Sequence, residues 1–276
     1  MIGDVSAFCC PVCGAALTKK DRSLVCPAGH CYDYAKSGYV NLLMSQQGGL
    51  HGDDRPMVRA RTAFLSAGHY KPLFDLIFET LCPCLPEEPR IMDAGCGEGW
   101  YTQMLSDALV ARGDRPQTVG VDISRDALAA AAKRKFGAEF AVASLFHVPL
   151  PDGWADGILN VFAPDCMDEY FWILKPGGYL LKVIPLEEHL LELKQAVYSS
   201  VYENEVSPPE HPGFTLVSDT KLRFTLTLED NETVRNLFAM TPYGRKTSPA
   251  DLAKLDTVGS LQTRVAFSLL LYRKAN

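Results

Sequence analysis

A glycine-rich turn between a buried strand and a helix constrains the fold of this chain more than any other feature. The apolar run "RIMDAG" (90–95) predicts a buried strand, and the turn "DAGCGEGW" (93–100) leads from it into a predicted helix. Its three glycines allow the backbone to turn tightly and to approach a ligand on the strand ends. This order of elements indicates an α/β domain that binds a small molecule at the carboxyl edge of its sheet.

Strands and helices continue to alternate after this turn. "TVGVDI" (118–123) predicts a second strand, and the alanine-rich helix "SRDALAAAAKRKF" (124–136) follows with Ser124 as its N-cap. Three further strands are predicted: "EFAVAS", "ADGILNVF" and "GYLLKVIP". The tail reads strand "KLRFTLTL", helix "NETVRNLFAM" and a long last strand, "TRVAFSLLLYR". This order predicts a mostly parallel, doubly wound α/β sheet, in the seven-stranded Rossmann-like variant of methyltransferase domains.

The glycine spacing and a neighbouring acid indicate the ligand. A dinucleotide-binding turn reads G-x-G-x-x-G, which places a pyrophosphate on the helix terminus. Here Gly95, Gly97 and Gly99 read G-x-G-x-G, and Asp93 stands two positions before the first of them. This pattern suits a ligand with a cationic amino group and no phosphate at the turn, as S-adenosylmethionine has. NAD is the weaker alternative.

The end of the second predicted strand supports the same cofactor. Asp122 stands 27 residues after Gly95. An ionised carboxylate offers two acceptor oxygens, so Asp122 can accept both ribose hydroxyl protons. The turn "LKPGG" (174–178), ahead of the fifth strand, also fits a methyltransferase domain. S-adenosylmethionine is therefore the predicted cofactor.

A second motif lies near the amino terminus, where five of the nine cysteines occur within 31 residues. Cys10-x2-Cys13 and a second pair, Cys26-x3-His30, have the spacing of two metal-binding knuckles. The pair Cys26-x4-Cys31 is equally allowed by spacing, and Cys9 adjoins Cys10. Four protein ligands would close the coordination shell, so the pattern predicts one structural Zn²⁺.

The chain divides into three predicted parts. Residues 1–45 form a small metal-stapled module, residues 46–85 a linker and helical connection, and residues 86–276 the cofactor-binding domain. Within the connection, "SQQGGLHGDDRP" (45–56) is polar and glycine-rich, as expected of a flexible linker. The helical pattern that follows it, 57–81, is interrupted at "SAGHYKP".

Charge and hydropathy bear on location and partners. The chain has no basic and apolar leader at its amino terminus and no run long enough to cross a bilayer, which favours a cytoplasmic protein without a membrane partner. The formal net charge is -6, which argues mildly against a nucleic-acid partner. However, residues 1–71 sum to about +3 and the remainder to about -9. A basic front module could therefore still contact phosphates.

Motifs along nearly the whole chain resemble a known family. The segments that carry the resemblance are "CPVC" with "CPAGH", "YDYAKSGYVNLL", "RARTAFLSAGHYKPL", "DAGCGEGWYT", "VGVDIS", "ILNVFAP", "LKPGG", "HLLELK" and "MTPYGRK". Together they resemble the bacterial 23S rRNA guanine-N1 methyltransferases of the RlmA type. The cysteine motif with "AKSGYVNLL" is far more specific than the glycine turn, which many methyltransferase families share.

The resemblance implies an activity and a set of site residues. It implies methyl transfer from S-adenosylmethionine to N1 of a guanine in a 23S rRNA hairpin, by a homodimer whose zinc module recognises the hairpin. It selects His30 over Cys31, so that the metal ligands are Cys10, Cys13, Cys26 and His30. It adds cofactor contacts from a tyrosine, the glycine turn and a histidine, namely Tyr70, Cys96, Gly97, Glu98 and His189.

The reaction requires an unpaired guanine and a proton acceptor, because N1 carries a proton in the Watson–Crick pair. Asp165, just after "VFAP", is the candidate base, with solvent or Glu98 as rivals. Three aromatic residues are candidates to stack on the target base, and each can equally be a packed core residue: Phe162, Tyr243 and Trp100.

Two sets of basic residues allow either an RNA-facing or a solvated interpretation. They are Lys19, Lys20 and Arg22 between the metal pairs, and Arg55, Arg59 and Arg61 at the start of the helical connection. Two other functions remain open from the sequence. One is a small-molecule methyltransferase with a structural zinc module, and the other is a non-catalytic regulator that binds RNA or cofactor.

Overall fold

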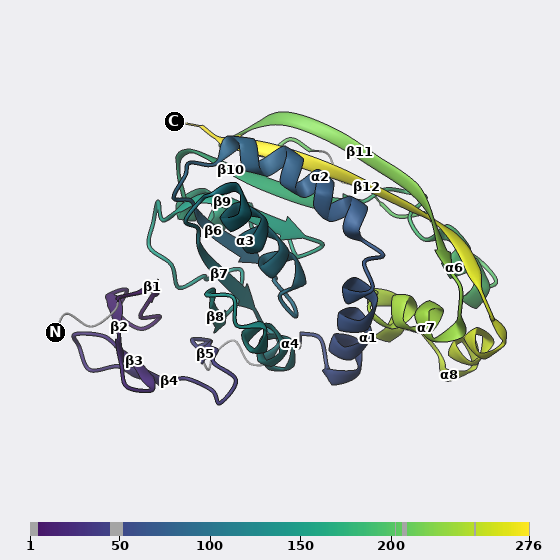
Figure 1. Ribbon diagram of the computed structural model, residues 1–276, viewed down its shortest axis with the longest axis horizontal. Helices are drawn as coiled ribbons and strands as arrows, with labels where there is room; N and C mark the ends of the chain where they lie inside the picture. The colour runs from purple at the N-terminus through teal and green to yellow at the C-terminus, as the bar shows by residue number, and fades with distance from the viewer. Residues whose placement is uncertain (1–4, 45–51, 202, 206–208, 246, 276) are drawn as a thin grey trace.

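The computed structural model describes residues 5–44, 52–201, 203–205, 209–245 and 247–275 (Figure 1). Residues 45–51, which make up most of the predicted linker, lie outside the described residues. The described part contains a four-stranded sheet and an eight-stranded sheet. No helix in it is both long and apolar enough to cross a membrane.

The four-stranded sheet forms the amino-terminal end of the molecule, shown in purple in Figure 1. Its strands pair in chain order, each antiparallel to the next. Their bounds are β1 (Val5–Cys9), β2 (Ala16–Lys20), β3 (Ser23–Val25) and β4 (Cys31–Asp33). None exceeds five residues, so the sheet by itself encloses only a small apolar core.

The eight-stranded sheet has the order β11-β12-β10-β9-β6-β7-β8-β5. Its strands are β5 (Val40–Asn41), β6 (Arg90–Ala94), β7 (Gln117–Asp122), β8 (Glu139–Val142), β9 (Ala155–Val161), β10 (Leu174–Pro185), β11 (Phe214–Leu228) and β12 (Leu261–Lys274). Strands β5 to β10 are mutually parallel, whereas β12 is antiparallel to both of its neighbours. Seven of these strands realise the predicted doubly wound sheet, so the predicted fold class is confirmed.

The eighth strand, β5, was not predicted. It contributes only Val40 and Asn41, which pair with β8 in parallel. A two-residue strand is too short to produce a periodic sequence pattern. Through β5, the chain that follows the small sheet extends the edge of the large one.

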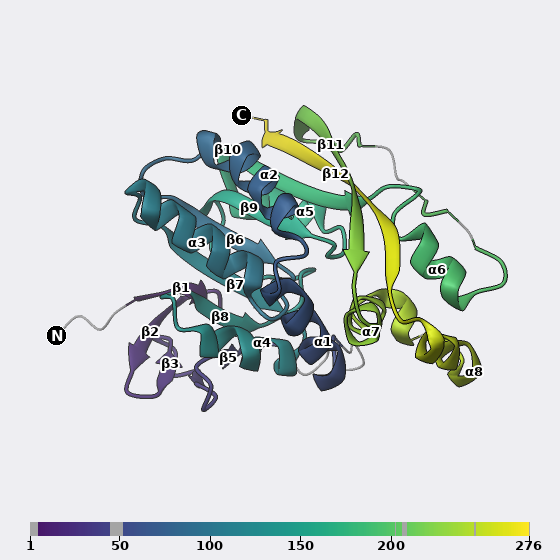
Figure 2. The same cartoon turned by 45° about the vertical axis from the view of Figure 1, so that its right-hand side comes forward.

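Helices cover both faces of the large sheet (Figure 2). The main helices are α1 (Arg55–Ser66), α2 (Lys71–Leu81), α3 (Trp100–Arg112), α4 (Arg125–Ala131), α5 (Met167–Ile173), α6 (Leu191–Val197), α7 (Asn231–Ala239) and α8 (Pro249–Leu252). Alternate strand residues point to opposite faces, as in Ile91, which packs with α2 and α3, and Met92, which packs with α5. The small sheet adds Phe8, Leu17 and Leu24 to the α5 face.

The predicted helical connection is two helices, broken where the sequence indicates. Asp54 caps α1 by accepting the backbone N–H of Met57 at 3.0 Å. The break lies at Gly68, whose φ of +82° is left-handed, and α2 restarts with Pro72 in its first turn. The second of these helices, α2, packs on β10 and β12, so the end of the connection lies against the large sheet.

The predicted cap of the next helix is also confirmed. The Ser124 hydroxyl accepts the backbone N–H of Ala127 at 3.0 Å, so α4 begins at Arg125. The regular helix ends at Ala131 and continues as one 3-10 turn, which is shorter than the predicted 124–136. Lys135 then adopts a left-handed conformation with a φ of +56°, which ends the helix.

Candidate functional site

Four side chains of the small sheet converge as a metal-binding cluster. The ligand atoms of Cys10, Cys13, Cys26 and His30 all lie within 4.8 Å of one another. The Sγ atoms of Cys13 and Cys26 are 3.7 Å apart, and the Nδ1 atom of His30 lies 3.3 Å from Cys26 Sγ and 3.4 Å from Cys10 Sγ. A tetrahedron with metal–sulfur bonds of about 2.3 Å has edges of about 3.8 Å. These three thiols and one imidazole therefore fit a tetrahedral Zn²⁺.

The surroundings of Cys10 favour the thiolate that a metal requires. Burial opposes ionisation, but hydrogen bonds from the Tyr32 hydroxyl and from the backbone N–H groups of Cys13 and Val12 lower the pKa of Cys10 to about 6. Tyr32 Oη lies 3.2 Å from Cys10 Sγ. Cys31 is exposed on β4 and does not belong to the cluster, so the choice of His30 agrees with the geometry.

The glycine turn after β6 occupies the predicted place at the carboxyl edge of the large sheet. A Cβ atom on Gly95 would lie 2.5 Å from the Cβ of Ala163, and one on Gly99 would lie 2.9 Å from the Cβ of Ala131. Both glycines have positive φ angles, +73° and +80°. The close approach of β6, β9 and α4 therefore requires glycine at these positions. The turn lies between β7 and β9, where the strand order reverses.

Asp93 is buried beneath this turn, with 3% of its surface exposed. Its Oδ2 accepts the hydroxyl proton of Thr102 at 2.6 Å. Burial raises the pKa of Asp93 to about 7, although the Thr102 hydrogen bond works in the opposite direction. A carboxyl group with this pKa gains its charge near neutral pH, and a neighbouring ammonium group would favour that charge.

Asp122 joins the end of β7 to the glycine turn. Its Oδ2 accepts the backbone N–H of Gly97 at 2.9 Å, and its Oδ1 accepts that of Ser124 at 2.7 Å. Burial raises the pKa of Asp122, and these two backbone hydrogen bonds oppose the increase. Each oxygen keeps a second lone pair, so the arrangement is compatible with the predicted ribose contacts.

An aromatic cluster contains the next two predicted cofactor contacts, Tyr70 and His189. The ring of Phe267 lies 5.4 Å from that of Tyr70, 4.5 Å from that of His189 and 5.1 Å from that of Phe162. His189 Nδ1 accepts the backbone N–H of Ala266 at 3.3 Å. Burial, and then the charge of Lys194, lowers the pKa of His189 to about 3, so the imidazole is neutral.

Cys96 and Glu98, two further predicted contacts in the glycine turn, are both buried. Cys96 is buried, and its Sγ packs toward Gly120, where a Cβ atom would lie 2.8 Å from it. Glu98 is 2% exposed, and its Oε2 forms an ion pair with Arg134. The other Glu98 oxygen, Oε1, is buried without a hydrogen-bond partner among the described residues.

The candidate base, Asp165, follows the carboxyl end of β9 in the chain. Its carboxylate is 43% exposed, and its Oδ2 lies 2.5 Å from Nζ of Lys182, which is buried on β10. Asn160 organises the intervening turn. Its amide donates to the carbonyl of Pro164, and its carbonyl accepts the backbone N–H of Ala163.

The three candidate stacking residues have different surroundings. Phe162 is 44% exposed, and its backbone is left-handed with a φ of +61°, which is uncommon for an aromatic residue. Trp100 is 7% exposed and packs edge-on against Phe74, which favours the core interpretation over stacking. Tyr243 lies in the turn that follows α7, where its hydroxyl donates to Asn204 Oδ1 at 2.9 Å.

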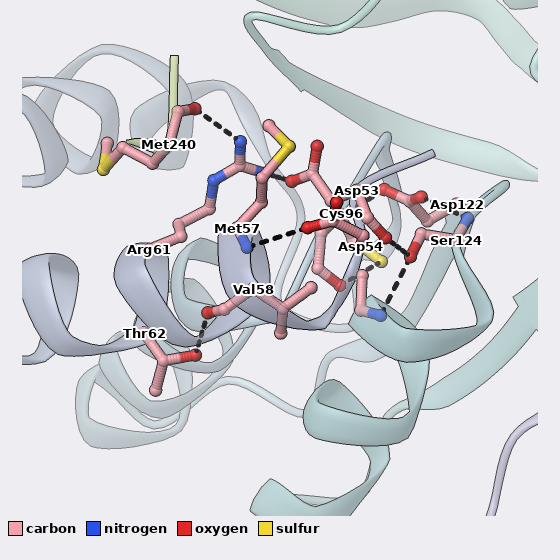
Figure 3. Close-up of polar contacts among 12 residues, drawn as sticks. Asp53, Asp54, Met57, Val58, Arg61, Thr62, Cys96, Asp122, Ser124 and Met240 are labelled. Carbon is pink, nitrogen blue, oxygen red and sulfur yellow. Dashed lines mark hydrogen bonds and ion pairs between the residues drawn. The ribbon is translucent and has the colours of Figure 1, made fainter. Parts of the chain in front are cut away.

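The basic residues separate into exposed and engaged groups. Lys20 and Arg22 are exposed on the small sheet, whereas Lys19 lies 3.7 Å from Glu139 of β8. The solvated interpretation of Arg61 does not hold, because its guanidinium is engaged within the protein. It reaches over the glycine turn and forms an ion pair with Asp53 (Figure 3). No sequence pattern indicates this contact, because Asp53 belongs to the predicted linker and Arg61 to the predicted helix that follows it.

The residues around the glycine turn fit S-adenosylmethionine on several counts. The turn keeps the left-handed glycines of the predicted motif, acidic groups lie at both predicted polar contacts, and an aromatic cluster supplies Tyr70 and His189. The hydroxyl of Tyr101 is buried without a hydrogen-bond partner among the described residues. Buried polar atoms of this kind are rare unless a ligand or water satisfies them.

Comparisons with known proteins agree with both sites. The family model of the RlmA N-terminal zinc ribbon matches residues 8–48, and a methyltransferase domain model matches residues 91–178. The 23S rRNA (guanine(748)-N(1))-methyltransferase of Streptomyces fradiae is 36% identical over 253 residues, which cover 89% of this chain and 88% of that protein. The YxjB protein of Bacillus subtilis (strain 168) is 30% identical and covers 98% of both chains. The chain therefore belongs to the RlmA family of 23S rRNA (guanine-N1)-methyltransferases.

Proposed function

We propose that this protein transfers a methyl group from S-adenosylmethionine to N1 of one guanine in a hairpin of 23S rRNA. One observation carries the proposal. The Cys3His cluster and the glycine turn occur together in a chain that matches a relative named for guanine 748 of 23S rRNA over 88% of that relative's length. A small-molecule substrate or a non-catalytic role gives no reason for the two sites to occur together.

The cofactor site of the proposal lies across the ends of β6 and β7. Asp93 attracts the amino group, Asp122 holds the ribose hydroxyls, and the turn at Gly95, Cys96, Gly97 and Glu98 provides the floor. Tyr70 and His189 enclose the apolar part from the side of Phe267. Neutral His189 suits a place beside a cationic sulfur, since a charged imidazole would repel it.

The chain's part in the reaction is to place guanine N1 and to receive its proton. S-adenosylmethionine, when bound, supplies an electrophilic methyl group on its sulfonium. Phe162 is the stacking residue of the proposal, because its exposed ring lies beside the aromatic cluster. Asp165 Oδ1 or Oδ2 accepts the N1 proton, while Lys182 holds the carboxylate in place. Positioning supplies much of the rate, since the methyl donor is already activated.

The zinc module is the RNA-recognition part of the proposal. Cys10 and Cys13 after β1, with Cys26 and His30 after β3, would hold Zn²⁺ and so order the small sheet, whose β2–β3 hairpin carries Lys20 and Arg22. These side chains are exposed, and within the described part of the chain neither forms an ion pair, in contrast to Lys19. Residues 1–45 form this module, residues 46–85 connect it, and residues 86–276 carry the cofactor domain.

A homodimer in the cytoplasm completes the proposal. Leu216 and Val217 are exposed on the edge strand β11, which supports pairing with a second copy there. Light scattering of the purified protein tests it. A mass of two chains is the expected result, and one chain at the concentration that gives activity contradicts it.

The test of the proposed reaction is methyl transfer from labelled S-adenosylmethionine to unmodified 23S rRNA, followed by nucleoside analysis. We expect N1-methylguanosine as the labelled product, with no label in 16S rRNA used as the control. A labelled product at another atom of guanine would contradict the N1 assignment. Absence of label, from protein that binds S-adenosylhomocysteine and zinc, would favour a small-molecule substrate.

A further inference from the structure

The cofactor's amino-acid end carries a carboxylate, and none of the predicted contacts offers it a positive charge. Asp93, Asp122 and Glu98 are acidic, and His189 is neutral. The ammonium group next to this carboxylate has a partner in Asp93, so the carboxylate would otherwise lie among groups of its own charge. A cation within the crevice would remove this repulsion.

Arg61 provides such a cation directly above the glycine turn (Figure 3). Its Nη1 would lie 3.3 Å from a Cβ atom on Gly97, and its side chain is 27% exposed. The Nη2 group donates to the backbone carbonyl of Met240 at 2.9 Å, which holds the guanidinium in place from the α7 side. Arg61 therefore comes from α1 but is fixed against the turn and the carboxyl-terminal part of the chain.

Asp53 supplies the carboxylate that Arg61 binds in this structure. Nη1 of Arg61 lies 2.5 Å from Asp53 Oδ2. Asp53 is also anchored through its backbone, because its carbonyl accepts the Ser124 hydroxyl at 2.5 Å. Its side chain is close enough to Asp122 to raise the pKa of that carboxyl, which Arg61 in turn opposes. The pair thus lies at the junction of the glycine turn and the ribose-binding end of β7.

Two buried polar atoms near Arg61 lack a hydrogen-bond partner among the described residues. The Tyr101 hydroxyl is buried without a hydrogen-bond partner among the described residues, as is Asp53 Oδ2, which meets Arg61 as an ion pair only. Arg61 and Asp93 both act electrostatically on Tyr101, so these groups surround one small region. A ligand carboxylate there could accept hydrogen bonds from both the guanidinium and the phenol.

We propose that Arg61 binds the carboxylate of S-adenosylmethionine, with Tyr101 as a second donor, and that Asp53 takes this place on Arg61 when no cofactor is bound. Cofactor binding then exchanges one carboxylate for another on the same guanidinium. The proposal rests on the cofactor site proposed above. It adds a specificity contact for the amino-acid end and a competing group within the chain.

Isothermal titration with two ligands tests the exchange. S-adenosylhomocysteine carries the amino-acid end, whereas 5′-methylthioadenosine has the same nucleoside thioether without it. We expect Arg61→Met to weaken S-adenosylhomocysteine about 10- to 100-fold and to leave methylthioadenosine unchanged, as for one lost charge-assisted contact. Arg59→Met, an exposed position on the same helix, is the matched control and should alter neither affinity.

The Asp53→Asn variant should change the affinity for S-adenosylhomocysteine in the opposite direction. This test remains valid even if the Arg61→Met protein fails to fold. Without the competing carboxylate, S-adenosylhomocysteine should bind about 2- to 10-fold more tightly, with methylthioadenosine again unchanged. Equal losses for both ligands in Arg61→Met, or weaker S-adenosylhomocysteine binding in Asp53→Asn, would overturn the proposal and leave the pair a structural latch. Wild-type protein that is folded but binds neither ligand would instead refute the proposed cofactor site itself.

Discussion

The small sheet and the large sheet are stabilised by different interactions. The four-stranded sheet has strands of three to five residues and depends on four side chains that face one point. The large sheet is covered on both faces by buried apolar side chains from helices and strands throughout the chain. A small core cannot offset the entropy of ordering its chain, so a metal replaces it in the small sheet. In the large sheet, burial of apolar surface suffices.

The two binding sites differ in the same way. The metal ligands lie within 21 residues of one another, from Cys10 to His30, and two short turns present them. The cofactor crevice is assembled from β6, β7, the start of α1 and the region after β10, which are remote in sequence. The first site therefore depends on local spacing and the second on the whole fold. Substitutions in the metal site and in the cofactor site should therefore have separable effects.

The largest effect is expected from Cys26→Ser. Loss of one thiolate should abolish tight zinc binding, which contributes about 10–16 kcal/mol in small zinc-dependent modules. Hydrogen exchange should then become fast across residues 5–44, while the amides of β6, β7 and β9 stay protected. Cys31→Ser, whose thiol is exposed outside the cluster, is the control and should retain one zinc per chain. Equal loss of protection in both sheets would show that the two regions fold as one unit.

Asp165→Asn should have the next largest effect and should act on the reaction alone. Loss of the proton acceptor should lower kcat about 100-fold or more, with affinity for S-adenosylhomocysteine unchanged. Binding should survive because the Asp165 carboxylate is partly exposed and pairs with Lys182, which is not one of the proposed cofactor contacts. Single-turnover kinetics measure the step. Unchanged turnover with intact cofactor binding would exclude Asp165 as the base.

Asp122→Asn should weaken the cofactor site without touching the small sheet. Both oxygens of the Asp122 carboxylate accept a backbone N–H, one from Gly97 and one from Ser124. The asparagine side chain has one oxygen and one NH2 group, so it can accept only one of these two hydrogen bonds. We expect S-adenosylhomocysteine to bind about 10- to 100-fold more weakly, since one charge-assisted hydrogen bond is worth about 1.5–3 kcal/mol. Zinc content should stay at one per chain. An affinity equal to wild type would remove Asp122 from the site.

The smallest predicted effect is a pH dependence of cofactor binding. The pKa of Asp93 is raised to about 7, so an ammonium ligand that prefers the ionised carboxyl should bind more tightly as pH rises through 7 and level off above it. Because the folded pKa exceeds the unfolded value, the same group should lower the stability of the free protein as pH rises toward 7. Titrations between pH 6 and 8 measure the affinity. Methylthioadenosine, which lacks the ammonium, should show a flat profile, and an equal slope for both ligands would contradict the Asp93 contact.

Local patterns predicted the parts of the molecule that local forces determine. The parallel strands, the Ser124 cap, the break near Gly68 and the convergence of the four metal ligands all follow from spacing within short segments. His30 was preferred to Cys31 only through the family resemblance, because both spacings allow a tetrahedral site. The eighth strand, β5, was not predicted because two residues are too few to show an alternating pattern of apolar and polar side chains.

Contacts between remote segments were not predictable from the sequence. Arg61 was one of three linker arginines, and nothing in the pattern distinguishes it from exposed Arg59. No sequence pattern indicates that the amide of Asn160 fixes the turn before Asp165. Trp100 reads as an accessible aromatic at the mouth of the crevice, but its contact with Phe74 of α2 buries it. Tertiary packing decides each of these.

The central claim is that the small sheet recognises RNA while the large domain binds the cofactor. Its most direct test measures two quantities on the full-length Cys26→Ser protein: affinity for S-adenosylhomocysteine, and primer-extension stops on 23S rRNA after incubation with S-adenosylmethionine. We predict affinity within about twofold of wild type, because the crevice lacks any zinc ligand, together with loss of the single stop that wild type produces. An undiminished stop, or loss of cofactor binding along with the stop, would contradict the claim.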